Sequence, residues 1–326
     1  MARRAADSST TANGGSSSGG SSNGGQSAGG STAAAGQSAG GSANGGSSSS
    51  GGTATSSGGR ANGGSSAGGA SGGSGGTTGS AGAAGASATG QPYKGVANSA
   101  CADLPKLNVS WWYNWNTGPG SCTVKEFVPM VSGKSTKTPE SVASAITGIG
   151  NAGYKNVLGF NEPNKADQAN MTVAQVITLW PSLTSNAGIR VGSAVTSADA
   201  MTWFSDFMAQ VNSQSLRVDF VALHWYGWNA GSCDAKAATF ENYLKWAEGV
   251  TGTRPIWITE WGCMNQSNPD KPTVEAFLTG AIAMLAKHPR VERYSWYPWN
   301  TNNELVNTDG TLTNLGTIYS NAPATK

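Results

Sequence analysis

The chain has 326 residues, and its composition divides it into two unequal parts. Residues 1–90 hold 29 of the 47 glycines and contain no Leu, Ile, Val, Phe, Tyr or Trp. A segment without large apolar side chains cannot bury enough surface to offset its chain entropy, so this Gly/Ser/Ala-rich stretch is predicted to be a disordered linker. Residues 91–326 carry every aromatic side chain and every cysteine, and they are numerous enough to form one domain with a full core.

Charge and hydropathy exclude several kinds of partner. Residues 91–326 contain 17 basic and 17 acidic side chains, and the basic ones are scattered singly, so no face for binding nucleic acid is expected. No apolar window is long enough to predict a membrane span. The repeated S-G-G, N-G-G and A-G-G units before residue 90 are typical of a flexible spacer, with a reach of roughly 50 Å. We expect the chain to act as a monomer.

From residue 91 onward, apolar runs of strand length alternate with amphipathic stretches of helix length. The predicted strands span residues 93–98, 107–115, 126–132, 156–162, 189–195, 218–226, 255–261 and 293–299. Most of them are nearly continuous in large apolar residues, which is typical of strands covered on both faces. Helices are predicted at residues 139–151, 172–187, 201–214, 235–250, 273–288 and 312–320, whereas the connections before residue 126 are predicted to be loops.

The order of these elements predicts the fold. Thr138 followed by Pro139 is a helix N-cap with Pro at the first helical position, and Pro181 is expected to bend or break the second helix. Alternation of strand and helix through eight strands predicts a single α/β barrel of the (β/α)₈ TIM type. A doubly wound open sheet is the alternative, but no glycine-rich phosphate-binding fingerprint follows the first strand.

Two predicted strands end in a carboxylate. The fourth reads N-V-L-G-F-N-E and ends at Glu162, and the seventh reads P-I-W-I-T-E and ends at Glu260. Because barrel active sites form at the C-terminal ends of strands, and because strands four and seven lie on facing sides of an eight-stranded ring, these carboxyl groups are expected to converge. Two opposed glutamates can hydrolyse a glycoside, one protonating the leaving oxygen and the other attacking the anomeric carbon. The alternative for either residue is a salt bridge or a helix cap.

Three polar residues near these strand ends are candidates for sugar contacts. Asn161 precedes Glu162 and can hydrogen-bond a sugar 2-hydroxyl. His224 and Tyr226 are two positions apart on the sixth strand and therefore share one face. If that face is inward, Tyr226 can donate a hydrogen bond to Glu260, and His224 can orient either carboxylate or bind a hydroxyl. The alternative is that His224 is a buried core residue whose ring nitrogens are hydrogen-bonded within the protein and contact no substrate.

Tryptophan is abundant, with 12 residues in the chain. Eight of them lie at or just beyond the C-terminal ends of predicted strands: Trp111, Trp112, Trp115, Trp225, Trp228, Trp261, Trp296 and Trp299. The flat indole face suits the C–H face of a pyranose, although roughly half of the aromatics on a strand point outward. On the second strand, small Ser110 and polar Asn114 favour the set that includes Trp112 as the inward one. We therefore expect Trp112, Asn114 and Trp296 to contact substrate.

The four cysteines predict two disulfides and no zinc site. None lies in C-x-x-C spacing, and no cluster of ligand residues or nucleotide motif predicts a metal or a cofactor. Of three possible connectivities, Cys101–Cys122 and Cys233–Cys263 would join loops of neighbouring strands; four reduced cysteines are the alternative. Two disulfides imply an oxidising compartment. We therefore expect an extracellular or cell-envelope protein, with the export signal absent from this sequence, whose first residues lack an apolar run.

An ordered set of motifs resembles a known family. The matching stretches are K-G-V-A-N-S from Lys94, S-W-W-Y-N-W from Ser110, F-V-P-M-V from Phe127, G-F-N-E-P-N from Gly159, H-W-Y-G from His224 and I-T-E-W-G-C from Ile258. N-E-P and T-E-W-G resemble the clan of retaining barrel glycosidases, and the whole set resembles glycoside hydrolase family 128, the β-1,3-glucanases. This resemblance implies Glu162 as acid/base, Glu260 as nucleophile and β-1,3-glucan as substrate.

Three functions therefore stay open from the sequence. The first is a retaining endo-β-1,3-glucanase that acts through Glu162 and Glu260. The second is a hydrolase of another β-glycan such as xylan or mannan, because the linkage is recognised by the shape of the groove. The third is a non-catalytic glycan-binding surface module on a stalk, which would explain the tail and the aromatics but not two opposed acids.

Overall fold

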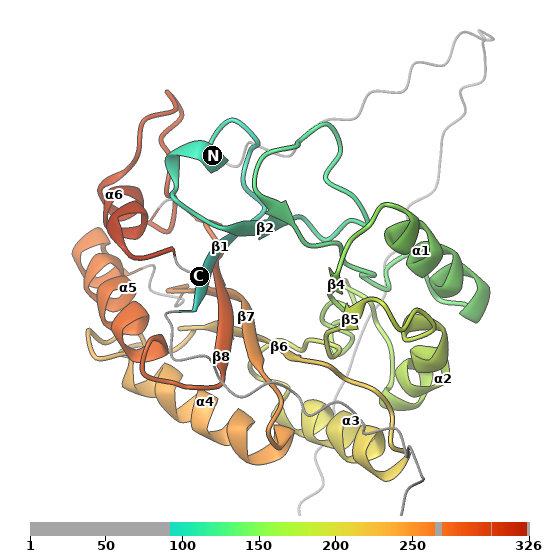
Figure 1. The fold of residues 1–326 in the computed structure, drawn as a ribbon. Coiled ribbons are helices and arrows are strands. Elements are labelled where there is room, and N and C mark those ends of the chain that lie inside the picture. The colour runs from blue at the N-terminus through green and yellow to red at the C-terminus, as the bar shows by residue number, and fades with distance from the viewer. Residues whose placement is uncertain (1–91, 265–268, 301, 325–326) are drawn as a thin grey trace, which may run out of the picture. The chain divides into compact units, whose positions relative to one another are not determined.

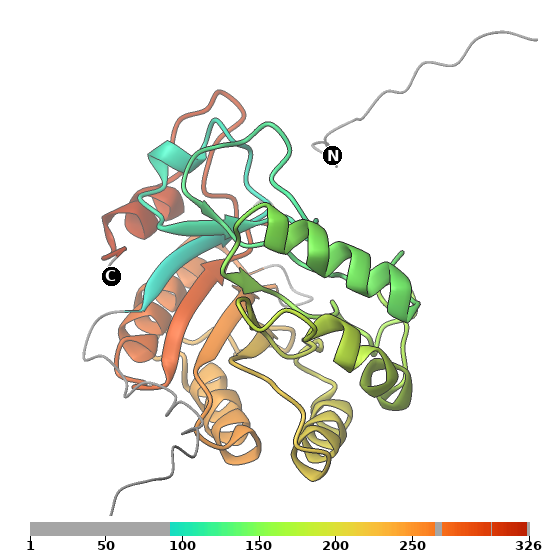
Figure 2. The ribbon, with the colours of Figure 1, turned by 45° about the vertical axis from the view of Figure 1, so that its right-hand side comes forward.

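The computed structural model describes residues 92–264, 269–300 and 302–324, so the predicted linker, residues 1–90, lies outside the described residues. In this part of the chain, parallel strands form a ring that helices surround (Figures 1 and 2). The strands are β1 (Tyr93–Ala97), β2 (Trp111–Tyr113), β3 (Glu126–Phe127), β4 (Asn156–Val157), β5 (Arg190–Val191), β6 (Val221–Tyr226), β7 (Ile256–Gly262) and β8 (Val291–Trp296). The helices are α1 (Pro139–Asn151), α2 (Val173–Leu183), α3 (Met201–Ser213), α4 (Ala238–Thr251), α5 (Lys271–Leu285) and α6 (Asn314–Asn321).

The eight strands close into a barrel. Six of them pair in the order β3-β2-β1-β8-β7-β6, and β4 pairs with β5. Single parallel bridges, Met130 with Leu158 and Gly192 with Phe220, join the two sheets on both sides. The predicted (β/α)₈ barrel is therefore confirmed, and the open sheet is excluded, because both ends of the six-stranded sheet are paired.

The elements differ from the predicted ones mainly in length. β3, β4 and β5 have two residues each, and beyond them the pairing continues as isolated bridges. Pro129, which has no N–H to donate, lies two residues after the end of β3. α2 keeps Pro181 but ends at Leu183. A 3₁₀ turn (Leu104–Lys106) connects β1 to β2, and residues 114–125 between β2 and β3 form no helix, as predicted. No helix in the described ranges is both long and apolar enough to cross a bilayer.

The core has two layers. An inner cluster is built only from the strands and the segments that extend them, and it includes Trp111, Tyr113, Phe220 and Trp257. An outer cluster joins the other face of the strands to the helices. Since neighbouring residues of a strand point to opposite faces, membership of a cluster tells which side chains face the barrel interior.

Ion pairs close the N-terminal end of the barrel. Arg190 forms a bidentate pair with Glu292 at 2.9 Å, and Arg293 contacts Glu126 at 2.8 Å. All four residues lie at or near the beginnings of strands. The C-terminal ends of the strands are therefore the side of the barrel on which an active site is expected.

Lys94 ties the first strand to the last helix. Its side chain is fully buried, and its Nζ donates hydrogen bonds to the carbonyls of Tyr319 and Ala322 at the end of α6, both at 2.5 Å. A cation at a helix C-terminus satisfies carbonyls that have no partner within the helix. Burial lowers the pKa of Lys94 to about 8.

Replacing Lys94 with Met is expected to lower the free energy of unfolding by about 2–3 kcal/mol, because buried carbonyls lose their donor. In the wild type the unfolded chain holds the Lys94 proton more tightly than the folded chain does. The stability difference between wild type and variant is therefore expected to grow as pH rises above 8. Urea unfolding at several pH values measures both effects. Lys245→Met, which removes an exposed pair with Glu241, is the control and should change stability little.

Candidate active site

An irregularity in β7 turns Glu260 into the barrel. Trp257 belongs to the inner cluster, so strict alternation would place Glu260 on the outer face together with Ile258. The register between β7 and β8 shifts between Ile258 and Trp261, and Trp261 lies in the outer cluster. A bulge of this kind re-aims the side chains that follow it. Glu260 therefore points inward, with an exposed fraction of 4%.

Three aromatic donors surround the Glu260 carboxylate. The Tyr113 hydroxyl and the Trp115 indole N–H donate to Oε1 at 2.9 and 2.8 Å, and the Tyr226 hydroxyl donates to Oε2. Burial, together with the charge of Glu260 and the hydrogen bond to it, raises the pKa of Tyr113 and of Tyr226 well above the ordinary value. Both phenols therefore keep their protons and remain hydrogen-bond donors to Glu260.

Glu162 is held at the end of the fourth strand in an unusual backbone conformation. Its φ is 40°, in the left-handed region that non-glycine residues rarely adopt, and Pro163 follows it. Its N–H donates to the carbonyl of Val195 at 2.7 Å, and its own carbonyl accepts from the N–H of Lys165 at 2.9 Å. Backbone strain of this kind persists where surrounding contacts fix it, and it is frequent at functional sites.

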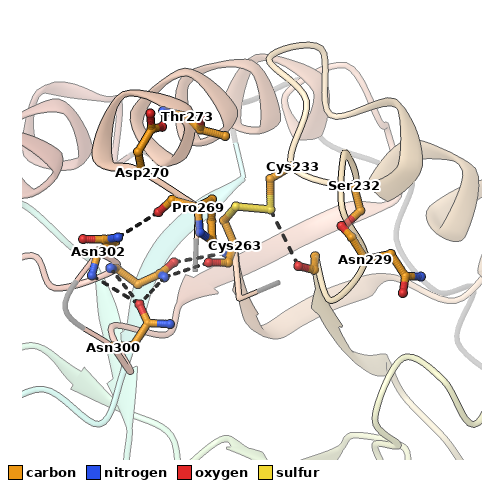
Figure 3. The surroundings of a disulfide bond; sticks show 11 residues. Asn229, Ser232, Cys233, Cys263, Pro269, Asp270, Thr273, Asn300 and Asn302 are labelled. Carbon is orange, nitrogen blue, oxygen red and sulfur yellow. Dashed lines mark hydrogen bonds between the residues drawn. A yellow bond between two sulfur atoms is a disulfide. The ribbon is translucent and has the colours of Figure 1, made fainter. Parts of the chain in front are cut away.

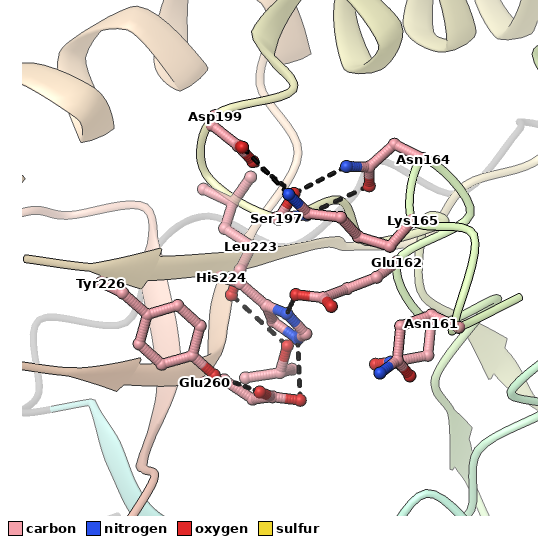
Figure 4. A network of polar contacts seen from close by, with 12 residues as sticks. Asn161, Glu162, Asn164, Lys165, Ser197, Asp199, Leu223, His224, Tyr226 and Glu260 are labelled. Carbon is pink, nitrogen blue, oxygen red and sulfur yellow. Dashed lines mark hydrogen bonds and ion pairs between the residues drawn. The ribbon is translucent and has the colours of Figure 1, made fainter. Parts of the chain in front are cut away.

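One imidazole lies between the two glutamates (Figure 4). His224 Nδ1 lies 3.0 Å from Glu162 Oε1, and His224 Nε2 lies 3.2 Å from Glu260 Oε1, the second contact without hydrogen-bond alignment. Burial acts to lower the pKa of His224. The negative charges of Glu260 and Glu162 and the hydrogen bond to Glu162 act in the opposite direction and are stronger, so the pKa of His224 lies above its ordinary value. The two carboxylates thus converge on one buried ring.

Polar side chains join the loop after Glu162 to the loop after β5 (Figure 4). Asn164 Nδ2 donates to Ser197 Oγ at 2.6 Å, and the N–H of Ser197 donates to Asn164 Oδ1 at 3.3 Å. Ser197 Oγ donates to Asp199, which also pairs with Lys165 at 3.0 Å. These bonds fix the segment that directly follows Glu162 and so restrict the motion of the Glu162 backbone.

Two disulfides and an asparagine fix the loops on the other side. Cys101 pairs with Cys122 and Cys233 pairs with Cys263, which are the two pairs expected from the proximity of their loops. Figure 3 shows the Cys233–Cys263 disulfide. Asn303 is fully buried and exchanges two hydrogen bonds with the backbone of Cys263, at 3.0 and 2.8 Å. The loops after β6, β7 and β8 are thereby linked to one another around Glu260.

The structure corrects the predicted faces of two tryptophans. Trp112 lies in the outer cluster and donates its indole N–H to the carbonyl of Val124, so its predicted inward orientation is wrong. Trp296 also lies in the outer cluster, fully buried, with its indole N–H on the carbonyl of Asn303. Asn114 accepts the N–H of Asn116 and contacts neither glutamate in the described part of the chain.

Asn161 lies beside the two glutamates, as Figure 4 shows. Two further residues, Tyr113 and Trp115, donate to Glu260 but were not among the predicted site residues. The Asn161 side chain is 7% exposed; its Nδ2 donates to Gln168, whereas its Oδ1 has no protein partner within the described ranges. Tyr113 and Trp115 alternate with Trp112 along the second strand and were therefore expected on its outer face, but they bind Glu260. A signal for them exists in β1: a Cβ on Gly95 would lie 2.5 Å from the Trp111 ring, so this glycine leaves space for the inward aromatic set of β2.

Exposed aromatics continue from Glu260 toward solvent. Tyr226 contacts Trp228 and Tyr297, and Tyr297 stacks with Trp299 at an interplanar angle of 14°. Trp228 and Trp299 are 41% and 60% exposed, more than any other tryptophan of the described residues. Such faces suit the apolar faces of sugar rings. No group of three or more His, Cys, Asp or Glu side chains in the described residues is arranged to hold a metal ion.

Tyr226→Phe is expected to reduce kcat/KM about 10- to 100-fold, because a hydrogen bond to a charged group is lost while the ring remains. Steady-state kinetics on a soluble β-1,3-glucan, the substrate that the sequence resemblance implies, measure this loss. The matched control is Tyr294→Phe, which removes a buried hydroxyl in the outer core that contacts no carboxylate in the described part. An equal loss in both variants would show that the effect comes from packing.

A barrel of this type with paired glutamates at the C-terminal ends of its strands defines a glycoside hydrolase. Residues 90–319 match the family model described as "Glycosyl hydrolase catalytic core". The chain belongs to this family, and its solved relatives place it in glycoside hydrolase family 128.

Two solved structures of β-1,3-glucanases and one curated fungal protein are similar to this chain. A subgroup I endo-β-1,3-glucanase from Amycolatopsis mediterranei, solved with laminaritriose, superposes with a TM-score of 0.61 at 32% identity and covers 70% of this chain and 98% of its own. A subgroup III curdlan-specific exo-β-1,3-glucanase from Blastomyces gilchristii does so with a TM-score of 0.60 at 28% identity, covering 70% of this chain and 97% of its own. Alkali-sensitive linkage protein 1 of Schizosaccharomyces pombe is 29% identical over 228 residues, which cover 65% of this chain but 40% of that protein.

Proposed function

We propose that the protein is a retaining endo-β-1,3-glucanase in which Glu260 is the nucleophile and Glu162 the acid/base. The observation that carries this proposal is the contact of one imidazole with both carboxylates, which brings the two acids to one site. Three donors hold the Glu260 carboxylate in place, as expected of a nucleophile, whereas the side chain of Glu162 is more exposed and, among the described residues, contacts His224 alone. The carboxyl separation is expected to be about 5–5.5 Å, the value typical of retention.

The reaction would proceed in two displacements. A Glu260 oxygen attacks the anomeric carbon, the glycosidic C–O bond breaks, and its oxygen takes the proton of Glu162. Glu162, now a carboxylate, takes a proton from water, whose oxygen attacks the anomeric carbon and releases Glu260. Two inversions leave the anomeric configuration unchanged. His224 would keep both carboxylates oriented throughout, since its ring contacts both.

The relatives support the substrate and the assignment of the acids. Structures of the Amycolatopsis enzyme with laminari-oligosaccharides include variants in which either of two glutamates is replaced. Those two glutamates are separated by nearly the same number of residues as Glu162 and Glu260. Endo action is supported by the relatives of subgroups I and II, and exo action, found in the subgroup III relative, is the competing mode.

Product analysis on linear β-1,3-glucan tests the proposal. NMR of the first-formed anomer is expected to show retention, and the early products are expected to be oligosaccharides of mixed length rather than glucose alone. Cleavage of xylan or mannan in place of β-1,3-glucan would overturn the substrate, and binding of β-1,3-glucan without any product would overturn the activity.

We also propose that the enzyme acts outside the cell or in the cell envelope. Two disulfides support an oxidising compartment, and a glycine-rich spacer would let a tethered barrel reach a polysaccharide. Counting thiols in the unfolded protein, with and without reductant, tests the oxidation state: four titratable thiols without reductant would remove the argument.

A further inference from the structure

A groove of about 560 Å³ lies between α1 and the segments that follow β2 and β3. Its volume falls within the range of about 300–1,000 Å³ that is usual for ligand sites. The groove exists because residues 114–125 form no helix after β2, so the flank of α1 that such a helix would cover in a regular barrel is left open. On this flank Ser141, Ser144 and Gly148 are spaced at helical intervals, and their small size leaves the groove unfilled.

The lining of the groove is uncharged and combines hydroxyl groups with apolar side chains such as Met130 and Ile149. Six hydroxyl side chains line it: Thr117, Ser132, Ser135, Thr136, Ser141 and Ser144. No charged side chain is among the described residues that line it. Thr136 Oγ1 is buried and has no hydrogen-bond partner in the described part of the chain, so a rotation about χ1 would offer it to a ligand. This chemistry fits a neutral ligand rich in hydroxyl groups and disfavours an ion.

Two residues that line the groove also make contacts in the catalytic site. Trp115 lines the groove and donates its indole N–H to Glu260. Ser132 also lines it, and its carbonyl accepts the N–H of Asn161, the residue before Glu162. The exposed aromatics Trp228 and Trp299 follow β6 and β8, on the other side of the barrel mouth. A polysaccharide that runs from these aromatics past the two acids would therefore reach the groove.

We propose that this groove binds glucosyl units of the substrate remote from the scissile bond and so makes cleavage depend on chain length. This inference rests on the proposed function and adds a specificity site to it. Binding energy from remote units contributes to kcat/KM for long chains and is absent for short ones.

Gly148→Phe tests the groove with little risk to the fold. A Cβ on Gly148 would meet no atom within 4 Å, so the ring can occupy the groove without a clash in α1. Gly249→Phe on α4 is the matched control, because this exposed helical glycine also meets no atom within 4 Å and lines no part of the groove. Each change is made in the active enzyme and in the Glu260→Gln background, and thermal unfolding checks that both variants fold.

Two measurements decide the proposal. In the active enzyme, Gly148→Phe is expected to lower kcat/KM on long laminari-oligosaccharides about tenfold and on laminaritriose less than about twofold, which corresponds to the loss of one modest contact. In the Glu260→Gln background, calorimetry with laminarihexaose is expected to show a similar loss of affinity. Equal kcat/KM values and equal affinities for Gly148→Phe and Gly249→Phe would overturn the proposal that the groove binds substrate. Absence of turnover in the wild type would overturn the proposed function instead, while the binding measurement would still decide the groove.

Discussion

Replacing Glu260 with Gln is expected to lower the turnover of linear β-1,3-glucan by about 10⁴-fold or more, the scale on which enzymes lose rate with their nucleophile. An amide carries no negative charge and cannot form the covalent glycosyl intermediate. The shape of the side chain is kept, and its oxygen can still accept from Tyr113 and Trp115. Release of reducing ends measures the loss, and unchanged thermal unfolding shows that the fold is intact.

The same experiment contains its own control. Glu304→Gln changes an exposed glutamate that forms no ion pair in the described residues, and it is expected to keep wild-type turnover. Rescue of Glu260→Ala by azide is expected to give a glycosyl azide of inverted configuration, since azide then attacks in place of the missing carboxylate. Substantial turnover by Glu260→Gln without added anion would remove Glu260 as the nucleophile.

Replacing Glu162 with Ala is expected to lower turnover of the natural polysaccharide about 10²- to 10⁴-fold, the usual contribution of general acid–base catalysis. The loss should depend on the leaving group. An aryl glycoside with a good leaving group needs no proton in the first step, so formation of the glycosyl-enzyme should stay fast. Burst kinetics on such a substrate separate the two steps.

Azide also distinguishes the role of Glu162 from that of Glu260. In Glu162→Ala, azide would attack the glycosyl-enzyme from the side that water normally uses, so the product is expected to keep the configuration of the substrate. A product of inverted configuration, or an equal loss of rate on activated and natural substrates, would contradict the assignment of Glu162 as acid/base.

The periodicity of the sequence was sufficient to predict the architecture. Continuous apolar runs and the helix signals at Thr138 and Pro139 correspond to β-strands and to α1, whose N-cap is the predicted Thr138. The shortness of β4 and β5 could not be predicted, because the apolar residues beyond them fill the core equally well when they pair only through single bridges. The hydrophobic pattern of a sequence indicates which residues are buried, but it does not indicate which backbone groups form β-sheet hydrogen bonds.

Side-chain direction was harder to predict than position. On β2 both alternating sets contain aromatics. The set with Trp112 was predicted to face inward because it contains small Ser110 and polar Asn114, a criterion that fails where aromatics fill the barrel interior. On β7 alternation from Trp257 would have turned Glu260 outward, and only the shift in register corrects this. A bulge is a property of strand pairing, so one strand read alone does not contain it.

The bond between Lys94 and α6 has a consequence for biosynthesis. Translation makes the lysine 225 positions before its acceptor Tyr319, and β1 must also wait for β8, its neighbour in the ring. Until then a cationic side chain destined for a buried position stays in water, and the edge of the first strand stays unpaired. Completion of the barrel is therefore expected to wait until residue 319 has left the ribosome, and a ribosome stalled before residue 319 should carry a protease-sensitive intermediate.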